Sequence, residues 1–104
     1  MNKLILLTAV AVASTAPAVA AKPMHYTGEA LAVNAKYTIV QARAIAIKAH
    51  PGAITDQELE KEGGGSGLRY SFDIKAKGKK TFEVGVDAMT GKVLENKAEG
   101  KNPD

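Results

Sequence analysis

Hydrophobic positions between residues 37 and 96 follow a helical period first and an extended period afterwards. Within residues 39–49, isoleucine and alanine fall on one broad face at about 100° per residue, and polar residues lie elsewhere. Thr38 followed by Gln41 fits a capping box at the start of this stretch. His50-Pro51-Gly52 ends it, because proline cannot continue a helix. The pattern predicts one helix within residues 37–50.

Alternating apolar and polar positions after this helix predict strands. Ile54 and Leu59 are five positions apart, so both can face inward only if the first strand contains a bulge. The alanine-rich helix is the one sizeable element that can cover the apolar face of the resulting sheet. We therefore predict a two-layer α+β fold, with one helix on a four-stranded antiparallel meander. The predicted strands are residues 53–62, 68–76, 81–87 and 92–96.

The first 21 residues have the pattern of a secretory signal peptide. Lys3 precedes a short apolar run, and small residues end at Ala20 and Ala21, either of which suits cleavage. The run is shorter than the roughly 20 residues that span a bilayer. We expect a periplasmic or secreted protein of a bacterial envelope, without a stable membrane anchor.

Three further segments follow the predicted signal peptide. A weakly patterned N-terminal arm covers residues 22–37, and its residues 29–35 fit either one or two helical turns or an extended backbone. The folded domain is expected at residues 38–96. A polar, flexible tail is expected at residues 97–104.

Composition narrows the possible functions. Of the 104 residues 45% are hydrophobic, but removal of the predicted signal leaves 83 residues with 32 apolar side chains, a lean core. The chain has no cysteine, which excludes disulfides, thiol catalysis and cysteine zinc sites. The formal charge of +3 is spread along the sequence, and we expect no nucleic-acid partner. Composition leaves the oligomeric state open.

Side chains with catalytic or metal-binding chemistry do not cluster in the sequence. His25 and His50 are far apart, whereas a metal site needs three or four converging ligands. Ser66 and Ser71 are not in a nucleophile motif. The acidic run of residues 56–62 fits a solvated strand face. We predict no enzyme, cofactor or metal site.

Two groups of residues are candidates for recognition. Asp87, Thr90 and Gly91 suit a tight turn, and we interpret them as a structural motif or a recognition loop. A second apolar stripe on the helix and outward-facing strand positions give a candidate partner surface, namely Val40, Ile47, Arg69 and Lys75. One of the two edges of the sheet could also accept an extended peptide by strand addition. A lysine cluster at one hairpin, Lys75, Lys77, Lys79 and Lys80, is interpreted as a solvated strand end.

Between residues 38 and 95 the sequence resembles the PepSY domain family. The resemblance rests on the helix positions Ala42, Ile45, Ala46 and Ala49, on His50-Pro51-Gly52, and on residues 58–60, 70–74 and 86–94. It implies a helix on a curved antiparallel sheet and an association with inhibiting or chaperoning proteases. It supplies no catalytic residues.

The sequence therefore predicts an exported, non-enzymatic PepSY domain protein that binds a protein partner. That partner is expected to be a secreted or periplasmic peptidase, which the protein would modulate or inhibit in trans because no peptidase domain follows. The alternative is an envelope protein that binds a small ligand or metal ion through the acidic strand or His50, without a peptidase partner.

Overall fold

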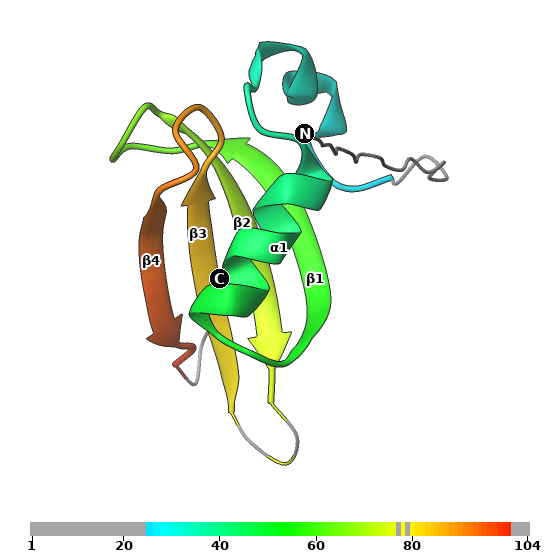
Figure 1. Cartoon of the computed structure of the whole chain (residues 1–104), viewed down its shortest axis with the longest axis vertical. Coiled ribbons are helices and arrows are strands. Elements are labelled where there is room, and N and C mark those ends of the chain that lie inside the picture. Colours follow the sequence, from blue (N-terminus) through cyan, green and yellow to red (C-terminus); the bar gives the residue numbers. More distant parts are fainter. Residues whose placement is uncertain (1–24, 77, 79, 101–104) are drawn as a thin grey trace, which may run out of the picture.

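The computed structural model describes residues 25–76, 78 and 80–100 (Figure 1). The predicted signal peptide, Lys77, Lys79 and the end of the predicted tail lie outside the described residues. In sequence order the elements are the 3-10 helix η2 (Glu29–Asn34), the α-helix α1 (Ile39–Ala49), and the strands β1 (Ala53–Lys61), β2 (Leu68–Lys75), β3 (Thr81–Asp87) and β4 (Val93–Ala98).

The four strands form one sheet in the order β1-β2-β3-β4, and each adjacent pair is antiparallel. The predicted α+β meander with a single covering helix is confirmed. The last strand is longer than predicted, because pairing continues to Phe82 opposite Ala98. Lys97, predicted to begin the flexible tail, therefore lies within β4.

Helix α1 begins at the predicted capping box. The Gln41 amide donates to Thr38 Oγ1 at 3.1 Å, and the Thr38 amide donates to Gln41 Oε1 at 2.9 Å. The helix ends when His50 donates its amide to Ala46 O, directly before Pro51. Both ends therefore form where local sequence satisfies or blocks backbone hydrogen bonds.

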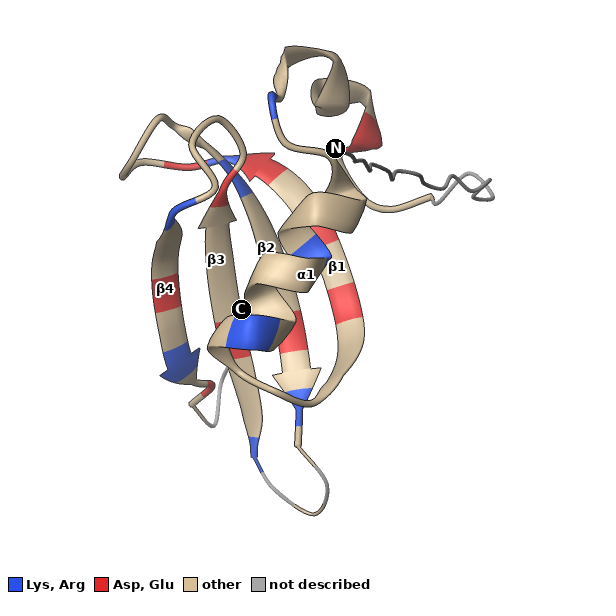
Figure 2. Cartoon of the chain, viewed as in Figure 1, with Lys and Arg blue, Asp and Glu red and all other residues tan. Residues whose placement is uncertain are grey.

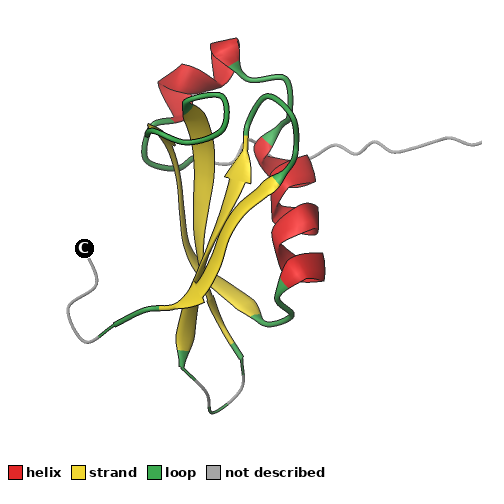
Figure 3. Cartoon of the chain, turned by 90° about the vertical axis from the view of Figure 1, so that its left-hand side faces the viewer, coloured by secondary structure: helices red, strands yellow, loops and turns green. Residues whose placement is uncertain are grey.

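The core lies between α1 and one face of the sheet, as the side view in Figure 3 shows. Ala42 and Ala46 are completely buried on the inner side of the helix. Their small side chains allow the helix to lie close to the larger groups of the sheet. The sheet contributes its fully buried apolar side chains Leu59, Tyr70, Phe72, Ile74, Val84 and Val86.

A bulge in β1 brings both of its apolar residues to the helix side, as the sequence spacing predicts. The register with β2 shifts between Ile54 and Asp56. Leu59 is 1% exposed, and Ile54 packs against the core from its margin. The extra residue, Thr55, donates its hydroxyl to Asp73 O at 3.3 Å.

The segment before α1 folds onto the outer edge of β1. Thr27 forms a parallel bridge with Glu58, and its carbonyl accepts the Leu59 amide at 2.9 Å. Gly28 has φ 84°, and a Cβ there would lie 1.8 Å from Leu59 O, so this approach requires glycine. Residues 29–34 then form η2. Of the two alternatives that the sequence left open for this segment, helical turns or an extended backbone, the structure has the helical turns.

Replacement of the helix cap is expected to destabilise the domain. Thr38→Ala leaves the Gln41 amide without its acceptor and should lower the free energy of unfolding by about 1 kcal/mol. Thr38→Ser retains a hydroxyl and should stay close to wild type. Urea denaturation followed by circular dichroism measures both, and equal stability of the two variants would contradict a capping role.

Candidate functional site

The Asp87 carboxylate is buried at the end of β3 and joins two loops. Its Oδ1 accepts from the Ser66 hydroxyl at 2.7 Å and from the Met89 amide at 2.8 Å, and the Thr90 amide lies at 3.3 Å. Its Oδ2 accepts the Ser66 amide at 2.7 Å. Burial acts to raise the pKa of Asp87, but these hydrogen bonds outweigh it and hold the pKa below its usual value. Asp87 therefore fixes the β2 entry loop to the β3–β4 turn as a charged acceptor.

The other two residues of the predicted turn motif also have structural partners. Thr90 Oγ1 accepts the Lys92 amide at 3.2 Å. Gly91 has φ 78°, and a Cβ there would lie 2.6 Å from the Tyr37 ring. The Tyr37 carbonyl in turn accepts the Tyr70 hydroxyl at 2.7 Å. Turn chemistry therefore accounts for all three residue types, while recognition by this loop stays a prediction.

The four residues of the predicted partner surface do not form one patch. Val40 is 55% exposed near the start of α1, and Ile47 is half-buried and packs against the core. Lys75 is exposed at the end of β2. Arg69 lies on the opposite face of the sheet from the core, and it is only 7% exposed.

Arg69 is buried because it lies across the outer face of the sheet. A Cβ on Gly85 would lie 3.1 Å from Arg69 Cδ, so the arginine crosses β3 where a side chain is missing. Its Nη1 donates to Glu95 at 3.1 Å and lies 3.7 Å from Glu62, and its Nη2 donates to Gly63 O. The glycine at an outward strand position was the sequence signal for this close approach.

Carboxylates lie side by side on the rest of this outer face, and Figure 2 shows acidic positions spread over the strands. Strand register places Asp56 opposite Asp73, and Asp73 opposite Glu83. Burial, a hydrogen bond with Glu99 and repulsion from Glu99 and Asp56 raise the pKa of Asp73 to about 6. Burial and the neighbouring carboxylates also raise the pKa of Glu83. This arrangement places like charges opposite one another, which destabilises a sheet.

Neither histidine lies in a cluster of metal ligands. His50 stacks on Phe82 with ring centroids 3.9 Å apart, and His25 Nδ1 lies 3.1 Å from Glu29. Within residues 25–76, 78 and 80–100, no group of three or more potential ligands converges. Neither helix in that part of the protein combines the length and hydropathy that a membrane crossing requires.

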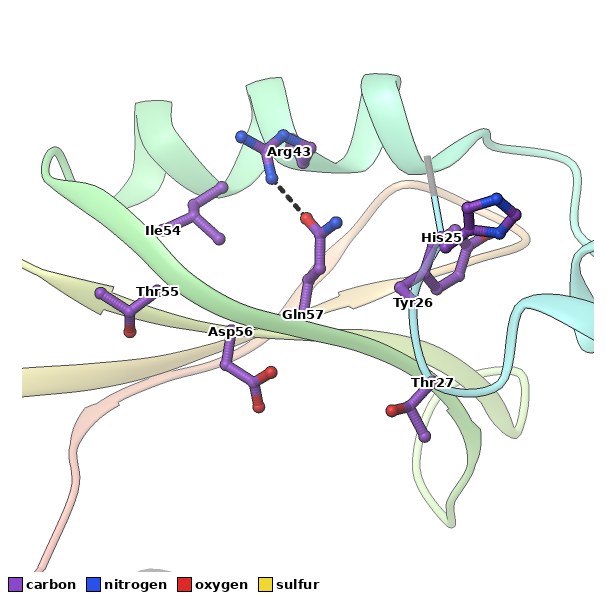
Figure 4. Close-up of a pocket in the computed structure, with 8 residues that line it drawn as sticks. All are labelled: His25, Tyr26, Thr27, Arg43, Ile54, Thr55, Asp56 and Gln57. Atoms are coloured by element: carbon purple, nitrogen blue, oxygen red, sulfur yellow. Dashed lines mark hydrogen bonds between the residues drawn. The ribbon is translucent and has the colours of Figure 1, made fainter. Parts of the chain in front are cut away.

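A groove of about 300 Å³ lies along the outer edge of β1, beneath α1 (Figure 4). Residues 25–27 close one end, residues 54–57 form the strand side, and Arg43 reaches down from the helix. The Arg43 guanidinium donates to Gln57 Oε1. Helical periodicity places Arg43 among the polar positions outside the main apolar face of α1, and it does not indicate that the side chain lies beside a strand edge.

Neutralisation of Asp87 is expected to destabilise the domain more than loss of one of its donors. In Asp87→Asn, the side-chain NH2 group must face either the Ser66 backbone amide or the Met89 backbone amide. Two donors then oppose each other, which should cost about 1–3 kcal/mol. Ser66→Ala removes the hydroxyl bond but keeps the Ser66 amide bond, and should cost about 1 kcal/mol. Urea unfolding compares them, and a larger loss for Ser66→Ala would contradict the role of the carboxylate.

The outer carboxylates are expected to make stability depend on pH. The pKa of Asp73 is about 6 in the folded protein against 3.8 for an unperturbed group, so its favourable contribution is present below pH 3.8 and lost as the pH rises through about 6. Asp73→Asn cannot ionise and should therefore be more stable than wild type at pH 7.5. The gain is on the order of 1 kcal/mol, because solvent screens a partly exposed group.

Unfolding free energies of wild type and Asp73→Asn at pH 4.5 and 7.5 test this dependence. The excess stability of Asp73→Asn over wild type should be larger at pH 7.5 than at pH 4.5. Glu29→Gln is the control, because hydrogen bonds with the Tyr26 amide and His25 lower the pKa of Glu29. Loss of the Glu29 charge should therefore give no gain in stability at pH 7.5. An Asp73→Asn effect that is the same at both pH values would contradict the shifted pKa.

Residues 36–97 match the family model of PepSY, the peptidase propeptide and YPEB domain. The searches of curated proteins and of solved structures found no match. The matched range covers more than half of the 104 residues and includes α1 and the sheet from β1 to Lys97. It identifies a small domain and no catalytic domain. The resemblance seen in the sequence is confirmed, and the chain belongs to the PepSY domain family.

Proposed function

We propose that this PepSY domain protein is exported and acts as a non-enzymatic binding module that modulates an envelope peptidase in trans. The observation that carries the proposal is the match of residues 36–97 to a domain described as a peptidase propeptide. Export rests on the sequence of the first 21 residues, with a positive start, a short apolar run and a small-residue end.

The use of the hydroxyl groups supports a binding role rather than catalysis. The Ser66 hydroxyl donates to Asp87 at 2.7 Å, and the Ser71 hydroxyl donates to Glu60 at 2.8 Å. A nucleophilic serine instead needs a general base, usually histidine, within hydrogen-bond reach. Here the serine hydroxyls connect strands and loops, which is a structural use.

The sheet supports a binding role because its outermost strands retain free hydrogen-bonding edges. Among the described residues, β4 has a strand neighbour only on its β3 side, and the edge of β1 is paired only at Thr27. Free strand edges present backbone donors and acceptors that an extended segment of a partner can use. This is the geometry by which a small module can engage a protein without catalytic groups.

Affinity capture followed by peptidase assays tests the proposed function. Residues 22–104 are immobilised, incubated with envelope extract of the source organism, and the retained proteins are identified by mass spectrometry. We expect an envelope peptidase among them, whose activity falls as soluble protein of residues 22–104 is added. Beads carrying the urea-unfolded protein serve as the control. The modulating role would be refuted if no peptidase is retained and the peptidase activity of the envelope extract is unchanged by the soluble protein.

A further inference from the structure

The outer edge of β1 is only partly used by the rest of the described residues. Thr27 pairs with Glu58, and its carbonyl accepts the Leu59 amide. From Ala53 to Gln57, no described residue pairs with this edge. The pairing at Thr27 thus shows that the edge can accept an extended segment, and the adjoining part is unpaired among the described residues.

The unpaired part of the edge faces the groove beneath α1. The groove, of about 300 Å³, has room for a short extended segment beside the strand. Figure 4 shows Ile54 and Gln57 on the α1 side of β1, where Arg43 comes down from the helix. Ile54 provides an apolar contact, while Gln57 and Arg43 provide polar ones. An extended peptide here would meet a strand edge on one side and a guanidinium above it.

The charge on the α1 side of the groove is positive. Arg43 donates to the neutral amide of Gln57 and forms no ion pair within the described part of the protein. The one carboxylate among the described residues that line the groove, that of Asp56, points to the side of β1 away from α1 in Figure 4. Its register partner on β2 is Asp73. His25, at the closed end, lies 3.1 Å from Glu29. An arginine whose one described partner is neutral is suited to a carboxylate, which it can bind through two parallel hydrogen bonds.

The bulge limits the length of the segment that can pair. The register shift between Ile54 and Asp56 interrupts the regular spacing of backbone groups at Thr55. Thr27 occupies the other end of the edge. Only a few residues of a partner can therefore pair between these points, which suits a polypeptide terminus or the tip of an extended loop.

We propose that the groove between α1 and the open edge of β1 binds a short extended peptide segment of a partner, with a carboxylate of that segment on Arg43. The proposal rests on the proposed function in assuming a protein partner, and it adds the site and the chemistry of the segment. The carboxylate is either the C-terminus of the partner polypeptide or an acidic side group within the segment.

Synthetic peptides test the proposal without a peptidase. The probes are acetyl-Val-Thr-Val-Thr-Val as the free acid, the same peptide as the C-terminal amide, and acetyl-Val-Thr-Glu-Thr-Val-amide. Each is titrated to millimolar concentration into 15N-labelled protein of residues 22–104, with NMR shifts as the readout. We expect at least one acidic peptide to bind about tenfold more tightly than the neutral amide and to shift the amides of residues 54–57 and the Arg43 side chain. The acidic peptide that binds identifies the source of the carboxylate.

Variants separate the guanidinium from general electrostatics. Arg43→Gln should reduce the affinity for the acidic peptide about tenfold, to that of the neutral amide. Lys48→Gln is the matched control on an exposed position of the same helix, and should change the affinity less than about twofold, because solvent and salt screen an exposed charge. Arg43→Lys keeps the charge without the fork geometry and should give an intermediate affinity.

Two results would overturn the proposal. One is the absence of shifts at residues 54–57 with every peptide. That result would also be obtained if residues 22–24 of the protein itself occupied the groove, and it would overturn the proposal in that case too. The other is equal binding of acidic and neutral peptides by wild type, which is informative even if Arg43→Gln fails to fold. Neither result bears on the capture of a peptidase through another surface, so failure of this site and failure of the proposed function are distinguishable.

Discussion

The two buried alanines of α1 lie in close contact with the apolar face of the sheet, and this contact holds the two layers of the domain together. An isolated helix of 11 residues is marginal in water, so α1 is stable mainly because Ala42 and Ala46 bury their face against β2 and β3. The domain has no cysteine and therefore no disulfide to support it. Larger side chains at these two positions would separate the layers and expose the sheet.

The Asp87 carboxylate organises the end of the domain at which η2 and the loops meet. It joins the loop at Ser66 to the turn at Met89 and Thr90, and the carbonyl of the next residue, Ala88, accepts the Tyr37 amide before α1. The same turn contacts the Tyr37 ring through Gly91. The family motif at this turn thus connects the sheet to the entry of the helix. Its charge is tolerated in a buried position because four hydrogen bonds satisfy it.

The surfaces outside the core differ in charge and in the backbone groups that they expose. The outer face of the sheet carries opposed carboxylates, with Asp73 among them, and Arg69 lies buried across the same face against Glu95. The β1 groove combines an open backbone edge with Arg43. In the proposed complex the strand edge would set the direction of a bound peptide, and the guanidinium would select for a carboxylate. Both properties suit recognition of an extended peptide. The matching family model is described as the peptidase propeptide and YPEB domain.

The helix and the strands can be predicted from local sequence, because helix period, strand alternation, the Thr38–Gln41 cap and the turn at Gly91 are encoded by neighbouring residues. The β1 bulge is also predictable, since Ile54 and Leu59 can share a face of the strand only if an extra residue lies between them. The contacts of Arg69 and Arg43, by contrast, follow only from the packing of the folded domain. Both stand at polar positions in their own elements, but one crosses a glycine on the neighbouring strand and the other reaches a strand edge 14 residues away. Such contacts depend on the register and approach of packed layers, which local periodicity does not specify.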